Sequence, residues 1–474
     1  MDRCTQRLKT QMKRQTNEHL ILVVFCSLAL LPFQRTDAQE APDPKEKLQA
    51  VSRTMQGIMS IHDIPSASAI VLVDGTTHVV NFGKQTRGGK TNVDQKSIYQ
   101  IASLSKTFVG IVTHELMKTG VLKVDDSITK HLPNDLNEET KKKLSKITVA
   151  HLLHHRSGLP RSSPQRTKDK TGSVNITYTD ANLLQDLNQI KLPFEPGTKV
   201  AYSNFGYALL AHLCERAAGK PYAELLKEYV TQKYSMPNTG LSITSAQQEF
   251  LVTPYNDDDR NMATTPWSMG KLAPPSAVYS TTEDLARLMK IQLKDYQAFE
   301  ANSVVSPLVL TNNKREMGNN SELSYGYGFY DSGNGKLGHG GGMDGYGSEY
   351  VIAPSSNTGF VMLTSSCGPW SIRLADGVMK ILAGTQEDIA SEVIAVEKII
   401  VEFRTKGLDA AFQVYQKLRS AKPSPLGVDS RISLVNLANQ FRLDDAAKLF
   451  LGDALEDFPK SKKLKSLKEQ LEGQ

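Results

Sequence analysis

The sequence predicts a mixed α/β fold: an antiparallel sheet flanked by helices, with an all-helical insert, followed by a C-terminal helical segment. Two observations predict it. Short strand-like segments stand near the start and the end of residues 39–387, whereas helical spacing dominates between about 100 and 310. Residues 388–474 contain little glycine and several further helical stretches. We therefore expect the early and late strands to pair into one sheet, with the insert between them in the chain.

The length and composition are those of a globular protein. The 474 residues suffice for one large domain and a smaller one, and 39% of them are hydrophobic and 22% charged. The formal charge is +6, and the first 38 residues account for half of it, with six Lys or Arg against three Asp or Glu. Such a small excess gives no reason to expect nucleic acid as a partner.

Residues 1–38 have the order of a secretory signal peptide. Two basic residues precede an apolar run at 20–33, and Thr36 and Ala38 supply small residues at the −3 and −1 positions of a cleavage site. The run is short for a membrane span, and an uncleaved anchor is the alternative. We expect an exported protein, periplasmic or secreted, with no integral membrane span after cleavage.

The first elements of residues 39–387 are a helix and a hairpin. Apolar residues recur with helical spacing between Pro44 and Asp63. Two short strands follow, Ala67–Val73 and His78–Phe82, joined by the tight-turn pair Asp74-Gly75.

The insert is predicted to be helical. Ser280 followed by Glu283 forms a capping-box pattern at the start of one helix. The predicted helices are Ser103–Lys118, one within Glu139–His155, Phe205–Ala218, Tyr222–Tyr229 and Thr281–Leu293.

Strand character returns after the insert. We expect strands at Tyr325–Tyr330, Glu349–Ile352 and Gly359–Thr364, with a turn at Gly333-Asn334-Gly335 and a final helix at Trp370–Ala383.

The tail, residues 388–474, contains a possible internal repeat. Leu408-Asp409-x-Ala411 with Tyr415 recurs 35 residues later as Leu443-Asp444-x-Ala446 with Phe450. The nearest standard period is the tetratricopeptide (TPR) repeat of 34 residues, a helix-turn-helix unit that binds partners. A helical cap packed on the catalytic domain explains the pattern equally well. A protein partner through residues 388–474 is therefore one of two open interpretations.

Cysteine and histidine patterns give no metal site. Only Cys214 and Cys367 remain after the signal peptide, and the sequence does not decide whether they pair, although buried free thiols are preferred. His151, His154 and His155 have a spacing that can hold zinc on a helix, but no H-E-x-x-H pattern accompanies them. We expect no metal and no cofactor.

Ser103 and Lys106 form the first chemical motif, S-x-x-K. Ser103 begins a predicted helix, and Lys106 lies about one turn further on the same face. A serine hydroxyl needs an adjacent base to become a nucleophile, and a helix N-terminus favours a developing anion. Alone, the motif is equally an N-cap serine followed by a surface lysine.

Tyr202 and Asn204 form the second motif, Y-x-N, between a turn and a predicted helix. A phenol beside a cationic lysine loses its proton more easily and can act as general base. The asparagine amide can bond a substrate. A loop tyrosine and a capping asparagine are the alternative interpretation.

His339 followed by Gly340, Gly341 and Gly342 forms the third motif. A strand edge without side chains lets a substrate pair with main-chain groups. The N–H groups of Gly342 and Ser103 can form an oxyanion hole. The alternative is a glycine-rich turn with an incidental histidine.

The order of the three motifs is specific. With it, the sequence resembles the serine β-lactamase and penicillin-binding protein superfamily, whose motifs are S-x-x-K, a central polar triplet and a basic residue before glycine. The middle Y-x-N resembles the class C branch, which also includes D-alanyl-D-alanine carboxypeptidases, D-aminopeptidases and carboxylesterases. The similarity covers about residues 45–385 and includes Val149–Pro160, Phe194–Gly197 and Ser280–Ala286.

The resemblance implies a β-lactamase/transpeptidase-like fold and a role for each motif residue. Ser103 is then the nucleophile, Lys106 its activator and Tyr202 the general base, with Asn204 at the substrate. His339 stands where β-lactamases have lysine and is mostly neutral near pH 7, which makes it a weaker anchor for a carboxylate.

The function expected is therefore that of an exported serine hydrolase with an acyl-enzyme at Ser103. Its substrates would be D-amino-acid peptides, small amides or esters, and the His339 departure favours peptidase or esterase over β-lactamase activity. The alternative is a partner-binding protein that acts through its helical tail and carries a weak or vestigial hydrolase domain.

Overall fold

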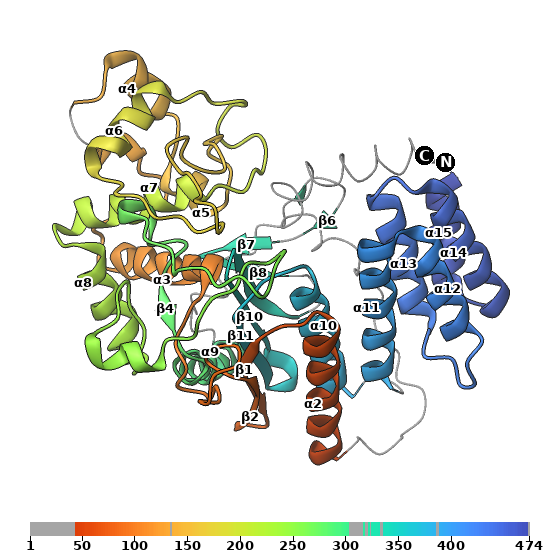
Figure 1. Cartoon of the computed structure of the whole chain (residues 1–474). Coiled ribbons are helices and arrows are strands. Elements are labelled where there is room, and N and C mark those ends of the chain that lie inside the picture. Colours follow the sequence, from red (N-terminus) through yellow and green to blue (C-terminus); the bar gives the residue numbers. More distant parts are fainter. Residues whose placement is uncertain are drawn as a thin grey trace. The chain divides into compact units, whose positions relative to one another are not determined.

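A computed structural model describes residues 43–132, 135–302, 316–317, 321–322, 324–331, 335–384 and 388–472 (Figure 1). The expected signal peptide and the turn at 333–334 lie outside these ranges. Contacts divide the chain into two compact units: the first holds Ile64–Ala375, and the second joins residues 43–63 to 376–472. The helix α10, Trp370–Leu382, carries the chain from the first unit into the second.

The first unit is built on one seven-stranded antiparallel sheet, as the sequence predicts. Its strand order is β2-β1-β11-β10-β9-β8-β7, so the earliest strands pair with the latest. Asp74 and Gly75 join β1 to β2 with φ of 49° and 78°, the left-handed conformation that this tight turn requires. The strands are β1 Ser66–Val73, β2 Thr76–Gly83, β7 Ser324–Gly326, β8 Phe329–Asp331, β9 Leu337–Met343, β10 Tyr346–Ala353 and β11 Thr358–Thr364.

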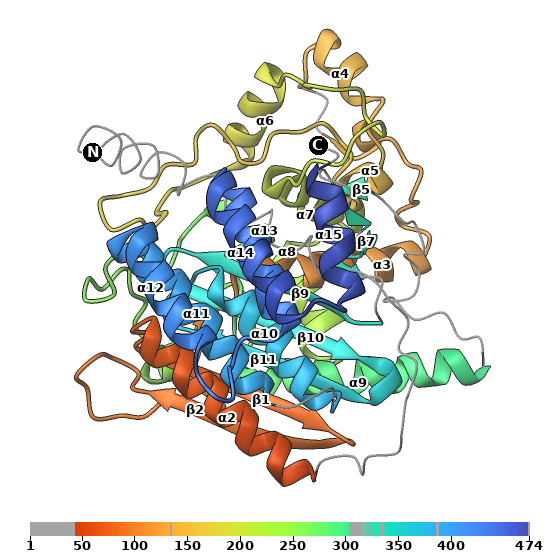
Figure 2. The ribbon, with the colours of Figure 1, turned by 90° about the vertical axis from the view of Figure 1, so that its right-hand side faces the viewer.

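Helices of the insert cover this sheet and extend beyond it. The helix α3, Ser105–Lys118, is buried around most of its circumference, which is typical of a core helix, and it packs against α7. In both views α4 and α6 lie at the end of the unit opposite β2 (Figures 1 and 2). The other helices are α4 Glu138–Leu144, α5 Val149–Leu153, α6 Asp180–Gln189, α7 Asn204–Ala218, α8 Tyr222–Leu226 and α9 Thr282–Asn302.

Two predicted elements are each divided in the structure. The segment Glu139–His155 forms the two short helices α4 and α5, because Thr148 starts a new helix with a capping box to His151. The expected strand Tyr325–Tyr330 is the hairpin β7–β8, turned at Tyr327 and Gly328 with φ of 45° and 82°.

The predicted cap of α9 is wrong by one residue. Thr281, not Ser280, caps the helix, because Thr281 Oγ1 accepts a hydrogen bond from Asp284 N at 3.1 Å. Ser280 lies on the short strand β4, Tyr279–Ser280, where its hydroxyl bonds Thr239 instead. The helix continues to Asn302, well beyond the expected end.

The second unit consists of helices. Buried His62, just after α2, forms an ion pair with Glu397 on α11 at 2.8 Å. Gly57 on α2 has no side chain, which leaves room for the side chain of Ile394 on α11. Figure 2 shows α11 beside α12 and α13 beside α14, as the contacts require. The helices are α2 Pro44–Ile61, α11 Ile389–Lys406, α12 Leu408–Arg419, α13 Val428–Gln440, α14 Asp444–Asp457 and α15 Lys462–Glu472.

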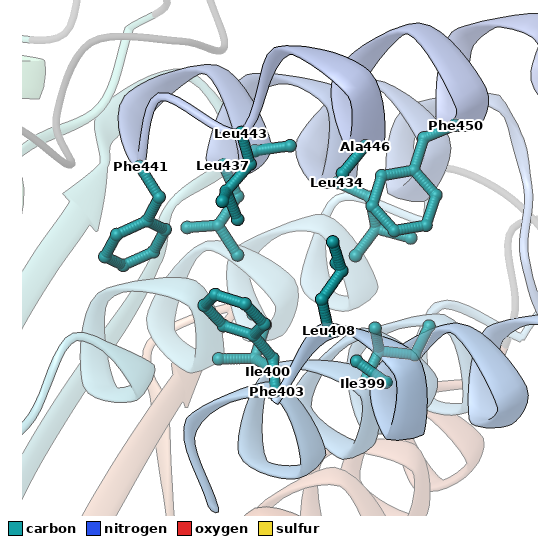
Figure 3. Close-up of a pocket in the computed structure, with 12 residues that line it drawn as sticks. Ile399, Ile400, Phe403, Leu408, Leu434, Leu437, Phe441, Leu443, Ala446 and Phe450 are labelled. Carbon is teal, nitrogen blue, oxygen red and sulfur yellow. The ribbon is translucent and has the colours of Figure 1, made fainter. Parts of the chain in front are cut away.

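The two copies of the sequence repeat fall on α12 and α14. Tyr415 and Phe450, equivalent in the repeat, are buried and meet edge to face with ring centroids 4.8 Å apart. An apolar pocket lies among α11, α12, α13 and α14 (Figure 3), with a volume of about 30 Å³. That volume holds one or two water molecules and is too small for an organic ligand.

Cys214 and Cys367 are both buried free thiols. Cys214 lies in α7, with its Sγ 3.4 Å from Thr113 Oγ1, and Cys367 precedes α10.

None of the helices that the structure describes is both long and apolar enough to cross a bilayer.

Candidate active site

Ser103 lies on a tight turn at the start of α3. The 3-10 turn Ala102–Leu104 links the strand β3, Tyr99–Gln100, to that helix. Ala102 has φ of 47°, an uncommon conformation for a residue with a Cβ. The turn is held from β10, because Ser348 Oγ donates a hydrogen bond to Ile101 O at 2.7 Å. Strain of this kind persists only where the surrounding structure fixes it, as at functional sites.

Lys106 is fully buried and contacts Ser103. Its Nζ donates hydrogen bonds to Ser103 Oγ at 3.2 Å and to Pro275 O at 2.9 Å. Burial lowers the pKa of Lys106 well below 10.5, and the guanidinium groups of Arg161 and Arg166 lower it further. The site therefore favours the neutral amine, which can accept a proton.

Tyr202 completes a cluster with these two residues. Its hydroxyl is near enough to the Ser103 side chain for Ser103 to affect its pKa, and Lys106 Nζ lies 5.0 Å from the centre of its ring. His155 packs on the ring with centroids 4.3 Å apart, and His155 Nδ1 accepts the N–H of Ser203 at 3.1 Å. Burial raises the pKa of Tyr202 to about 12, despite the opposing effects of the Ser103 side chain and of Arg161. The cluster therefore favours the neutral phenol.

Asn204 begins α7 next to Tyr202. Ser203, rather than Asn204, caps the helix, since Ser203 Oγ accepts the N–H of Gly206 at 2.7 Å. Asn204 Oδ1 is buried and has no hydrogen-bond partner among the residues that the structure describes. A buried amide oxygen of this kind is available to a polar ligand.

His339 lies on β9, opposite Tyr350 of β10. Its Nδ1–H donates a hydrogen bond to Gly340 O, and its ring packs against Tyr330 with centroids 4.9 Å apart. Burial lowers the pKa of His339 to about 3, and the charge of Lys106 acts in the same direction. The imidazole is therefore neutral near pH 7.

The glycines after His339 bring β9 close to the nucleophile. A Cβ on Gly341 would lie 2.9 Å from Ser103 N and 2.6 Å from Ile101 O, so only glycine fits. Gly342 follows on the same strand, opposite Gly347 of β10. Gly341 thus lies against the nucleophile turn, and the oxyanion site expected from the N–H groups of Gly342 and Ser103 stays a prediction.

The edge of β9 beside these glycines pairs with no other strand that the structure describes. Among the described strands, β8 pairs with β9 only at Leu337 and Gly338, so the pairing with β8 stops short of Gly340–Gly342. This is the bare edge that the sequence predicts.

The three clustered histidines of the sequence do not share a ligand position. His151 Nδ1 accepts the N–H of Thr148 as part of the cap of α5, whereas His155 supports Tyr202. No group of three or more metal-binding side chains occurs in the described ranges.

Arg161 was not identified from the sequence. Its guanidinium carbon lies 5.2 Å from the centre of the Tyr202 ring, and its carbonyl accepts the N–H of Asn204 at 2.8 Å. The one available signal was its position directly after Val149–Pro160, a segment that also contains His155.

Comparison with known proteins identifies relatives of this arrangement. Residues 51–380 match the family described as Beta-lactamase. A β-lactamase of Pseudomonas fluorescens is 24% identical over 246 residues, 52% of this chain and 64% of that protein. The D-alanyl-D-alanine-carboxypeptidase/endopeptidase AmpH of Escherichia coli strain K12 is 27% identical over 273 residues, 57% of this chain and 68% of that one. The chain thus spans less than two thirds of the length of the Pseudomonas fluorescens enzyme.

Proposed function

Because the chain belongs to the Beta-lactamase family, within the serine β-lactamase and penicillin-binding protein superfamily, we propose that it hydrolyses its substrates through an acyl-enzyme at Ser103. One observation carries the proposal: the Ser103 hydroxyl lies 3.2 Å from a buried lysine amine whose pKa is strongly lowered. An adjacent base of this kind is what turns a serine into a nucleophile.

The charges of the site suggest how protons move in acylation. Neutral Lys106 accepts the Ser103 proton as Ser103 Oγ bonds to the substrate carbonyl carbon. The Tyr202 phenol, with its pKa near 12, donates its proton to the leaving nitrogen or oxygen as the scissile bond breaks, and takes one back from Lys106. This differs from the base role that the resemblance implies for Tyr202. Water then attacks the ester by the reverse proton path.

The proposed substrates are D-amino-acid peptides, small amides or esters. The AmpH relative is named as a D-alanyl-D-alanine carboxypeptidase and endopeptidase, which makes D-peptides the first class to test. Asn204, with its unpaired buried oxygen, would hold the substrate amide. We place the enzyme outside the cytoplasm, periplasmic or secreted, on the pattern of residues 1–38.

A fluorophosphonate probe with intact-mass detection tests the nucleophile. We expect one probe per mature chain, no labelling of Ser103→Ala, and full labelling of the control Ser145→Ala, an exposed serine at the end of α4. The same spectrum reports whether the mature chain begins at Gln39. Folded wild-type protein that takes up no probe would remove the proposal.

A further inference from the structure

The chain turns sharply at His155, just beyond the end of α5. This residue has φ of 55°, in the left-handed region where asparagine, aspartate and histidine are enriched over other residues with a Cβ. The carbonyl and the imidazole of His155 both reach the segment that carries Tyr202. The turn therefore brings one histidine against the second motif of the active site.

His155 holds the chain on both sides of Tyr202. Ala201, before the tyrosine, donates its N–H to His155 O at 2.8 Å, and Ser203, after it, donates its N–H to His155 Nδ1 at 3.1 Å. The phenol ring itself packs against the imidazole, with centroids 4.3 Å apart. One residue thus fixes the backbone before and after Tyr202 as well as the ring.

The imidazole of His155 is buried and neutral. The ring of Tyr207 also packs on it, with centroids 4.9 Å apart. Burial lowers the pKa of His155 well below 6.5, and the charge of Lys106 acts in the same direction. Because Nδ1 accepts a backbone N–H, the single proton of the neutral ring is on Nε2. A neutral ring that is fixed in this way suits the positioning of a neighbour better than proton transfer.

We propose that His155 is a positioning residue for the reaction, which holds the Tyr202 hydroxyl where the leaving nitrogen or oxygen departs. The inference rests on the proposed function, in which Tyr202 gives its proton to that atom. It deepens that function, because His155 then determines how well the enzyme cleaves substrates with poor leaving groups, such as amides and alkyl esters. Activated aryl esters, whose leaving groups depart as anions, need no such proton.

Two substitutions separate the hydrogen bond from the ring contact. His155→Asn keeps an acceptor near the position of Nδ1 and tolerates the left-handed conformation, but it has no ring. His155→Phe keeps a ring and has no acceptor. Fluorophosphonate labelling, in which fluoride leaves without a proton from Tyr202, should proceed in both variants and gives the concentration of intact sites.

A matched pair of esters tests the inference. Both carry the N-acetyl-D-alanyl group; one leaving group is p-nitrophenolate and the other is methoxide. We expect His155→Phe to lower kcat/KM for the methyl ester about tenfold to hundredfold, since a shift of about 1 Å can cost that much, and to change the p-nitrophenyl ester less than about threefold. The loss should be smaller in His155→Asn, which still accepts the N–H of Ser203.

A double-variant cycle tests whether His155 acts through the phenol. In the Tyr202→Phe background the substitutions at His155 should add little further loss on the methyl ester, because the group that they misplace is gone. His114→Asn is the control. His114 is also buried, on α3, and its ring meets that of Tyr327 with centroids 5.1 Å apart. This variant should cleave both esters at the wild-type rates.

The outcomes separate the inference from the proposed function. Equal losses on the two esters, or losses that add to that of Tyr202→Phe, would mean that His155 holds the site as a whole, and the inference would be wrong. Wild-type rates on the methyl ester in both His155 variants would also overturn it. So would a labelled wild-type protein that does not cleave the methyl ester, which leaves the proposed function standing. Absence of fluorophosphonate labelling would remove the proposed function and the inference with it.

Discussion

Lys106 Nζ lies 5.0 Å from the centre of the Tyr202 ring while it donates a hydrogen bond to Ser103 Oγ at 3.2 Å. One buried amine thus contacts both the nucleophile and the phenol. Because burial and two arginines lower its pKa, the amine can take the serine proton at a pH where an exposed lysine is charged. This relationship gives the first prediction.

Lys106→Met should abolish most of the activity and stabilise the fold. We expect kcat/KM and the fluorophosphonate labelling rate to fall about 10²- to 10⁴-fold, since the base is lost. The wild-type rate should be high above the folded pKa of Lys106 and fall as the pH drops through it. The thermal midpoint of the variant should rise, because a buried ionisable amine is replaced by an apolar chain of similar length. Labelling at the wild-type rate would contradict this role.

Tyr202→Phe should reduce turnover while keeping the site assembled. The ring contacts to His155, Lys106 and Arg161 survive, but the proton donor to the leaving group is lost, so kcat should fall about 10²- to 10⁴-fold with little change in KM. Tyr207→Phe is the matched control: its ring also packs on His155, and its hydroxyl donates to Leu153 O at 2.8 Å. The control should lose about 1 kcal/mol of stability and retain activity. Steady-state kinetics and thermal melts check both.

Gly341→Ala should displace the nucleophile turn. The new Cβ would stand 2.6 Å from Ile101 O and 2.5 Å from Ser348 Oγ, and relief requires movement of backbone next to Ser103. We expect labelling to slow by at least about tenfold and stability to fall by about 1–3 kcal/mol. Gly452→Ala, on α14 with open space around it, should instead raise the stability by up to about 1 kcal/mol and leave labelling unchanged. Equal labelling of the two variants would argue against a tight contact at Gly341.

Glu349→Gln should change the pH dependence of stability. Burial raises the pKa of Glu349 from 4.5 to about 7, so its contribution is fully present below pH 4.5 and is lost as the pH rises through 7. Above that pH the buried charge opposes folding by about 3 kcal/mol. The glutamine can keep the hydrogen bond from Ser371 and carries no charge. We expect the variant to gain stability over wild type at pH 8 and not at pH 5, as measured by denaturant unfolding.

The elements that local sequence determines were predicted well. Two short strand-like segments around the Asp74-Gly75 turn gave β1 and β2, and the spacing of three motifs gave Ser103, Lys106 and Tyr202, which the structure brings together. Local pattern was insufficient where two adjacent residues compete, as Ser280 and Thr281 do for the cap of α9. Backbone pairing elsewhere in the fold decides that case, since Ser280 belongs to β4.

Contacts between residues far apart in the sequence could not be predicted. The spacing in Pro44–Ile61 predicts a helix, but nothing local indicates that His62 meets Glu397, 335 residues away, in the second unit. Arg161 lies in a loop, and its place in the site depends on its contact with the Tyr202 ring, which the sequence does not show. The low pKa of His339 and the raised pKa of Tyr202 arise from burial, which only the folded structure shows.

The edge of β9 that no described strand pairs with has a consequence for aggregation. An unpaired strand edge is a template for adding a strand from another molecule, and proteins usually cover or charge such edges to avoid aggregation. Here the edge must stay accessible if substrates are to reach Ser103. The segment Gly340–Gly342 has no apolar side chains and a low β propensity. The free energy gained by a strand of another molecule that pairs with it is therefore small. Substituting these glycines with valine would threaten the protein's behaviour at high concentration as well as its catalysis.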